Sequence, residues 1–240
     1  MCTIVKRGYS PNDRKEFGNK ALDKLFDAGR DLQYLLNQGY NIKGASIFVG
    51  NHYLLSERQR LALVRAISSE KSIKIRKNKE NKIIPHGSVV NIDGFNTIIT
   101  LEVALSDSLL LKCMDGTIRD LAALRGTYRL IDKTDKAIIL IGRILESNKV
   151  GKAVFYLDAP VSNSGRLNQR ITELLNQFNF EVQVEVINNV DVVLEKLSNV
   201  ITSDAIILDK CVSWINLITK IIEEINKGYS YIDFSVLTNR

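Results

Sequence analysis

The sequence predicts an α/β protein in which a mainly parallel sheet is flanked by helices in a three-layer, Rossmann-like sandwich, preceded by a small all-helical domain. From residue 83 onward, strand-like apolar runs alternate with helix-like stretches, the pattern of βαβ units. Residues 154–157 are continuously apolar, as expected for a parallel strand that is buried on both faces. The first part of the chain instead carries apolar residues at helical spacing.

Three helices are expected in that first part. Residues 13–38 carry a helical apolar stripe, and residues 45–49 continue as a short helix. Ser56 and Gln59 have the spacing of a capping box, which opens a third apolar-periodic stretch at 61–67. Such a unit loosely resembles DNA-binding helical units, although three-helix units are commonly plain packing modules.

A charged run follows the helical part. Residues 70–82 contain six lysine or arginine side chains, and their simplest interpretation is an exposed linker or hairpin. Contact with a phosphate backbone is the alternative, because the run lies just before the first predicted strand. We therefore expect three parts: a helical N-terminal domain at 1–69, a basic linker at 70–86 and an α/β domain at 87–240.

The predicted elements of the α/β part alternate along the chain. Residues 182–187 alternate between apolar and polar side chains, which is typical of a half-exposed edge strand. Strands are expected at 88–92, 109–113, 153–157, 182–187, 200–202 and 213–217. Helices are expected at 97–105, 117–124, 134–147, 166–178, 190–197, 205–211 and 219–227.

Composition excludes several classes of protein. Hydrophobic content of 45% and charged content of 25% are ordinary for a globular protein, and no apolar run is long enough to span a bilayer. No signal-peptide pattern is present at the start, so we expect a cytoplasmic location. Three widely spaced cysteines and two histidines indicate neither a disulfide framework nor a zinc site. The Gly-rich fingerprints of dinucleotide-binding proteins and P-loop NTPases are absent from the sequence.

The net charge of +6 is unevenly distributed. Residues 1–90 hold 17 Lys/Arg and 8 Asp/Glu, a difference of +9, whereas residues 91–240 hold 16 and 19, a difference of −3. A basic part beside a mildly acidic part fits a polyanion-binding surface joined to a cation-binding centre. An ordinary solvated surface explains the same excess equally well.

Three aspartates stand where predicted strands end. Asp93 follows the first strand, Asp158 ends the strand at 153–157, and Asp204 follows the strand at 200–202. If these strands are neighbours in one parallel sheet, the three carboxylates converge at its C-terminal edge, where open α/β sheets bind ligands. Such carboxylates repel one another unless a hard cation neutralises them, which predicts a Mg²⁺ or Mn²⁺ site. Each aspartate alone is also explained as an ordinary turn or cap.

Other polar residues form a second tier of candidates. Asn96 either caps the following helix or holds the Asp93 carboxylate, and Asp209 is a fourth carboxylate in the helix that Asp204 would cap. A surface carboxylate paired with a lysine is the alternative for Asp209. Four arginines are candidates for holding a substrate phosphate, with ordinary surface positions as the alternative: Arg119, Arg125, Arg129 and Arg166.

The motifs around Asp93, Asp158 and Asp204 resemble those of the PIN-like nuclease superfamily, particularly its NYN branch. The resemblance implies an α/β/α sandwich whose strand-end acidic residues bind divalent metal and hydrolyse RNA. It implies metal-binding roles for these three aspartates, with Asp209 as a fourth and Glu102 as an option for a glutamate expected in that superfamily. Over nearly its full length the chain also resembles an uncharacterised prokaryotic family that combines a helical N-terminal unit with such a domain.

The expected function is therefore that of a Mg²⁺- or Mn²⁺-dependent phosphodiesterase acting on RNA, with lysines of the 71–82 run adding affinity that weakens as salt rises. Two alternatives remain open at this point. The first is a nucleic-acid-binding regulatory protein that keeps the fold without turnover. The second is a small-molecule phosphatase that uses the same acidic crevice.

Overall fold

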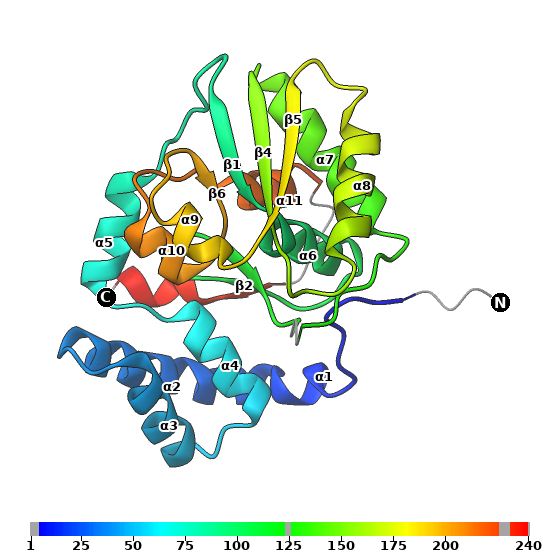
Figure 1. The fold of residues 1–240 in the computed structure, drawn as a ribbon. Coiled ribbons are helices and arrows are strands. Elements are labelled where there is room, and N and C mark those ends of the chain that lie inside the picture. Colours follow the sequence, from blue (N-terminus) through cyan, green and yellow to red (C-terminus); the bar gives the residue numbers. More distant parts are fainter. Residues whose placement is uncertain (1–4, 123–125, 226–230, 240) are drawn as a thin grey trace.

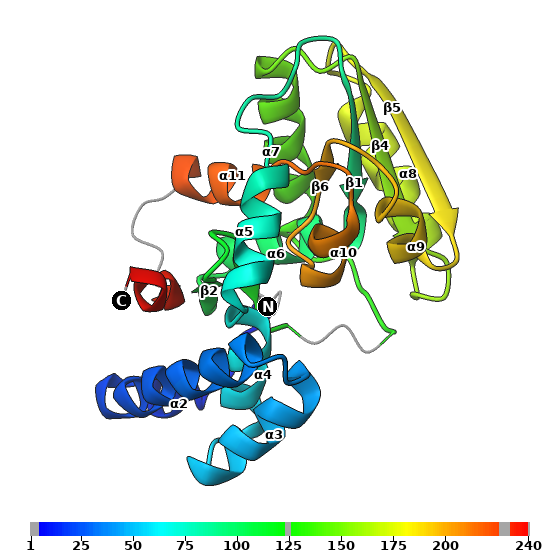
Figure 2. The same cartoon turned by 90° about the vertical axis from the view of Figure 1, so that its left-hand side faces the viewer.

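A computed structural model describes residues 5–122, 126–225 and 231–239 (Figure 1). It is a mixed α/β structure with a mainly parallel sheet flanked by helices and a helical region at the N-terminus, as the sequence predicts. Figure 2 shows that helices α2, α3 and α4 extend away from the α/β part of the molecule. Among the described residues, no helix combines the length and the apolar character that a membrane crossing requires.

The N-terminal helices begin with defined caps. The capping box at Ser56 is confirmed: the backbone N–H of Gln59 donates to Ser56 Oγ at 3.2 Å, and the Gln59 side chain accepts from Ser56 N at 3.0 Å. Asn41 caps the preceding helix by accepting from Gly44 N at 2.8 Å. The four helices are α1 (Asp13–Glu16), α2 (Asn19–Asn37), α3 (Ile42–His52) and α4 (Glu57–Ala66).

The main sheet has four parallel strands in the order β5-β4-β1-β6. Because β4 and then β5 are added on one side of β1, and β6 on the other, the strand order reverses between β1 and β6. Such a switch point opens a crevice at the C-terminal edge of the sheet. The strands are β1 (Val89–Asp93), β4 (Lys152–Asp158), β5 (Glu181–Ile187) and β6 (Val200–Ile201).

The two faces of this sheet are covered differently. One face packs in the main hydrophobic cluster against four helices: α6 (Gly94–Leu105), α7 (Thr134–Ser147), α8 (Ser164–Leu175) and α11 (Leu217–Ile225). Two short helices, α9 (Val190–Leu194) and α10 (Ala205–Lys210), lie at the other face with a smaller cluster around Trp214. In Figure 1 these short helices lie beside the lower ends of the strands, where the strands terminate.

A second, three-stranded sheet joins the helical region to the α/β part. Its order is β3-β2-β7, and it is followed by a 3₁₀ helix, η1 (Phe234–Asn239). Leu111 and Phe234 from this region share one buried cluster with Leu25 and Leu63 of the N-terminal helices. The strands are β2 (Leu110–Lys112), β3 (Ile118–Asp120) and β7 (Tyr231–Asp233).

Three predicted elements are corrected. Residues 117–124 are not helical where they are described: β3 pairs antiparallel with β2 through a turn in which Gly116 has a φ of +83°. Residues 213–217 form no regular strand, because Trp214 makes only isolated bridges and Leu217 already begins α11. The segment predicted as a basic linker, 70–86, contains helix α5 (Glu70–Lys79), capped by Ser69.

Candidate active site

The three strand-end aspartates all lie at the C-terminal edge of the main sheet. Asp93 ends β1, Asp158 ends β4, and Asp204 follows β6 as the N-cap of α10. Because β1 and β6 flank the switch point, Asp93 and Asp204 lie on its two sides. The strand signals in the sequence were sufficient to predict this edge.

Asp93 is the most deeply placed of these carboxylates, with only 8% of its surface exposed. Its Oδ2 accepts a hydrogen bond from Thr202 Oγ1 at 2.8 Å, and its Oδ1 accepts from the backbone N–H of Asn96 at 3.4 Å. Burial raises the pKa of Asp93 to about 7 against these two hydrogen bonds, and the negative charges of Asp204 and Asp191 raise it further.

Asp204 is held by the backbone around it. Its Oδ1 accepts from the backbone N–H groups of Ile206 at 2.7 Å and Ile207 at 3.2 Å, which caps α10. Its own N–H donates to Thr202 Oγ1 at 3.0 Å, and Thr202 is the residue that hydrogen-bonds Asp93. The cap leaves Oδ2 of Asp204 as the oxygen available to a ligand.

A fourth carboxylate, Asp191, joins the site from α9. Asp158 Oδ1 accepts from the backbone N–H of Val190 at 3.4 Å, which brings the start of α9 to the end of β4. Burial raises the pKa of Asp191, and the charges of Asp204 and Asp158 add to the effect. The prediction missed Asp191 because no strand-end motif precedes it directly: it lies in the first turn of α9, which follows β5.

We refer to Asp93, Asp158, Asp191 and Asp204 as the acidic edge. In the described part of the chain, no lysine or arginine forms a salt bridge with any of these four carboxylates. No three His, Cys, Asp or Glu side chains there are close enough together to form a ready-made metal site. The acidic edge therefore concentrates negative charge without being a closed coordination cage.

Asn96 and Gly94 shape the site from the start of α6. Asn96 Oδ1 accepts from the backbone N–H of Ser203 at 2.8 Å and from its hydroxyl at 3.0 Å, so its side chain fastens the β6–α10 loop rather than Asp93. A Cβ at Gly94 would lie 2.5 Å from Leu157 Cδ2 and 3.1 Å from the Tyr156 carbonyl oxygen. Glycine is thus required here by close packing between α6 and β4.

Two of the predicted site residues, Arg119 and Asp209, belong to a buried ion network instead. Arg119 is 4% exposed; it donates to the Ser203 carbonyl oxygen at 2.5 Å and pairs with Asp115 at 2.5 Å. Arg76 pairs with the same Asp115 at 2.6 Å and holds Asp209 through two hydrogen bonds, at 2.7 and 3.0 Å. Neither the phosphate contact expected of Arg119 nor the metal-binding role expected of Asp209 fits these positions.

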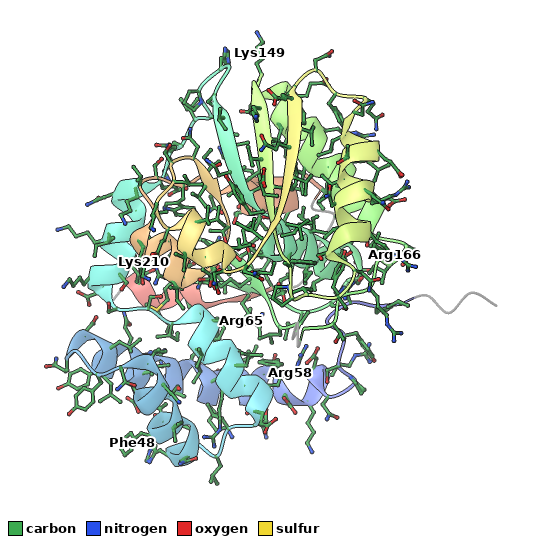
Figure 3. All side chains as sticks on the ribbon, in the orientation of Figure 1. Phe48, Arg58, Arg65, Lys149, Arg166 and Lys210 are labelled. Atoms are coloured by element: carbon green, nitrogen blue, oxygen red, sulfur yellow. The ribbon has the colours of Figure 1, made fainter. Side chains whose placement is uncertain are left out.

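The remaining candidates are distributed around the molecule. Arg166 is exposed at the start of α8, at the right of Figure 3, and Arg129 is also exposed. Arg125 lies outside the described residues. Glu102 is buried two turns along α6 and pairs with Arg7 at 2.8 Å while accepting from the Tyr128 hydroxyl at 2.7 Å, so it is not part of the acidic edge.

Comparison with known proteins finds two families of unknown function and one uncharacterised relative. Residues 85–220 match the family described as a domain of unknown function, DUF5616, and residues 24–79 match a protein of unknown function, DUF434. The chain is 38% identical over 203 residues to an uncharacterised protein of Methanocaldococcus jannaschii, MJ0935, covering 83% of this chain and 97% of that protein. No solved structure matches. Because the first match spans more than half of its length, the chain belongs to the DUF5616 family.

Proposed function

We propose that this protein is a Mg²⁺- or Mn²⁺-dependent phosphodiesterase that hydrolyses RNA on a PIN-like fold. The observation that carries the proposal is the acidic edge: four carboxylates without a salt-bridge partner among the described residues, at the C-terminal edge of a parallel sheet, with Asp93 and Asp204 on the two sides of its switch point. The resemblance of the three strand-end motifs to PIN-like nucleases supplies the reaction class by analogy.

The chemistry of these residues fits a hard divalent cation. Mg²⁺ is usually held by one or two protein carboxylates, retained waters and substrate phosphates, so a closed three-ligand cage is not needed. The free Oδ2 of Asp204 and the Asp93 carboxylate are the first candidates to hold it, with Asp158 and Asp191 at the rim. When bound, such an ion polarises a phosphate and lowers the pKa of a coordinated water.

The protein's own groups hold this edge in a fixed geometry. The Thr202 hydroxyl donates to the Asp93 carboxylate and accepts from the backbone N–H of Asp204. The Asp204 carboxylate itself is held by the backbone N–H groups of Ile206 and Ile207. Asn96 accepts from the backbone N–H of Ser203 and Arg119 donates to its carbonyl oxygen, which holds the loop between β6 and α10. These hydrogen bonds limit the freedom of both carboxylates before a cation binds.

RNA is the proposed substrate because of the analogy and because basic side chains are available to phosphates. Lys71, Lys74 and Lys77 recur at a spacing of three on α5, and all three are exposed. Helix α5 packs against α10, which Asp204 caps, so this lysine row lies on a neighbouring element of the site. Exposed Arg129 and Arg166 are further candidates to contact the phosphate backbone.

A second candidate is a nucleic-acid-binding protein without turnover. It is favoured by the absence, among the described residues, of three metal-ligating side chains already in coordination range. The same lysine row would then bind RNA through its phosphates alone. The two functions differ in whether Asp93 is needed for cleavage or only for the charge of the surface.

RNA cleavage with added Mn²⁺ separates them. We expect the wild-type protein to cleave a mixed-sequence single-stranded RNA, and Asp93→Asn to bind the RNA while losing cleavage. The asparagine side chain is nearly isosteric but can accept only one of the two hydrogen bonds that Asp93 accepts from Thr202 and Asn96 N, so circular dichroism is used to check that the variant is folded. Asp23→Asn, an equal charge change at an exposed position on α2, serves as the control, and this variant should cleave RNA normally. Metal-independent cleavage, or cleavage unaffected by Asp93→Asn, would refute the assigned site.

A further inference from the structure

A small pocket opens between α2 and α3, on the helical part of the molecule and away from the acidic edge. Its volume is about 150 Å³. Three aromatic residues, one histidine and one carboxylate line it: Tyr34, Phe48, Tyr53, His52 and Asp31. Phe48 is labelled on α3 at the lower left of Figure 3.

The helical spacing explains why these residues meet. Asp31 and Tyr34 are three residues apart on α2, and Phe48 and His52 are four apart on α3, so each pair lies on one face of its helix. Leu35 and Val49 complete the lining, and Val49 is buried beneath it. Two helix faces thus form a groove with aromatic walls over an aliphatic base.

The aromatic walls are unusually open to solvent. Phe48 is 68% exposed and Tyr34 is 64% exposed, although both line the pocket. Burying aromatic rings of this size contributes more than most other contacts in an interface, and exposed clusters of them mark binding surfaces. A small ion inside 150 Å³ would leave most of both rings uncovered. A polypeptide that lies across the groove would cover them.

The pocket also carries negative charge. Tyr53 donates its hydroxyl to Asp31 Oδ2 at 2.8 Å, and this hydrogen bond, followed by burial and the charges of Asp31 and Asp27, raises the pKa of Tyr53. Asp31 forms no salt bridge within the described ranges, whereas Asp27 pairs with Arg30. No lysine or arginine lines the pocket. This charge disfavours an RNA base as the occupant, because the phosphates of its nucleotide would approach Asp31.

We infer that the pocket binds an arginine side chain of a partner protein. The guanidinium group would lie against the rings of Tyr34 and Phe48, where a cation is attracted by the aromatic face, and would pair with Asp31. Arginine suits this arrangement because its planar group stacks on rings and donates several hydrogen bonds at once. The flanking residues of the partner would cover the outer faces of the two rings.

The full-length protein offers a direct readout of this site. It contains two histidines, His52 in the pocket and exposed His86 in a different part of the chain, so the side-chain NMR signals of one act as the control for the other. The probes are a blocked Gly-Arg-Gly peptide and the same peptide with citrulline, a neutral analogue of arginine. We expect the arginine peptide to shift the His52 signals saturably, with the citrulline peptide and His86 showing no such shift.

Variants make the test specific. Asp31→Asn keeps an acceptor for the Tyr53 hydroxyl and should weaken the binding of the arginine peptide by about 5- to 30-fold. Phe48→Leu should weaken this binding to a similar extent. Asp23→Asn, an exposed change of equal charge on α2, should bind as the wild type does. Equal shifts with both peptides, or no shift with either, would overturn the inference. So would unchanged binding of the arginine peptide to Asp31→Asn.

Discussion

Helix α10 has an aspartate near each end, and the two differ in what neutralises them. Asp209 is held by Arg76, which shares the buried carboxylate of Asp115 with Arg119. Asp204, the N-cap, has no such partner in the described structure, and its negative charge raises the pKa of Asp93 and of Asp191. The pKa of Asp115 is lowered to about 2 by Arg119 and Arg76 despite its burial, whereas burial and neighbouring carboxylates raise the pKa of Asp93 to about 7.

The comparison separates two uses of one residue type. A buried carboxylate paired with two arginines stabilises the fold, because removing either the negative or the positive partner leaves an uncompensated buried charge. A buried carboxylate beside others of the same sign is a cost to the fold, and such costs concentrate at sites that bind or react. The same substitution, aspartate to asparagine, should therefore have opposite effects on stability in the two regions.

The largest expected effect is at Asp115. Asp115→Asn leaves Arg76 and Arg119 buried without their shared counter-charge, and we expect a loss of about 3–5 kcal/mol in the free energy of unfolding. Urea denaturation at neutral pH measures it. Because the folded-state pKa of about 2 lies below the reference value of 3.8, the stabilisation from ionised Asp115 is complete well above pH 3.8 and is lost progressively as the pH falls from 3.8 through about 2. A loss below about 1 kcal/mol would remove the distinction between the two regions.

Replacing Asp93 with asparagine is expected to raise the free energy of unfolding, the opposite of the effect at Asp115. The folded-state pKa of Asp93, about 7, lies above the reference value of 3.8, so its contribution to stability is complete below about pH 4 and is lost as the pH rises through about 7. Asp93→Asn removes the ionisation, and we expect a gain of about 2–4 kcal/mol above pH 7 that vanishes in acid. Denaturation curves of both proteins across this pH range measure the difference. A pH-independent loss of stability in the variant would contradict it.

Replacing Asp191 should have a smaller effect, which is confined to the affinity for the cation. Because the Asp191 side chain still reaches solvent and caps nothing among the described contacts, Asp191→Asn should fold normally. We expect Mn²⁺ to bind this variant about 10-fold more weakly, since a neighbouring charge is lost while Asp93 and Asp204 remain. Titration calorimetry measures the affinity, with Asp23→Asn as the matched control. Unchanged affinity would limit the site to the strand-end carboxylates.

The smallest effect is expected on α5. Replacing Lys71, Lys74 and Lys77 with glutamine should reduce the slope of log affinity for single-stranded RNA against log salt by about 2, if all three contact phosphates. Cleavage of RNA that is already bound should be preserved, because these lysines lie outside the acidic edge. Affinity measured at several salt concentrations tests this. An unchanged slope would show that the lysine row is only a solvated surface.

The strand-end aspartates were predictable because buried parallel strands are recognisable in the sequence as apolar runs, and the C-terminal ends of parallel strands all lie at one edge of the sheet. Asp93 and Asp158 follow runs that the structure confirms as β1 and β4. Local patterns sufficed here, since the position of each side chain depends on its own strand. The helix caps at Ser56 and Asp204 were predictable for the same reason.

The buried ion network was not predictable in this way. Arg76 stands in a lysine-rich run that indicates an exposed segment, and its partners Asp115 and Asp209 are 39 and 133 residues away in the chain. Arg119 was expected in a helix, but β3 turns its side chain inward to Ser203 and Asp115. Such pairs depend on tertiary packing, which overrides the local pattern of charge.

The central claim is that Asp93 is an ionisable group left for a cation to neutralise. Carbon-13 NMR of the aspartate carboxyl groups across pH, with and without Mg²⁺, tests it most directly, and Asp93→Asn assigns the signal. The account predicts one carboxyl group with a titration midpoint near the pKa of about 7, and a fall of that midpoint by at least about one pH unit when Mg²⁺ is added. A midpoint near the ordinary value for aspartate, or one that Mg²⁺ does not move, would contradict the account.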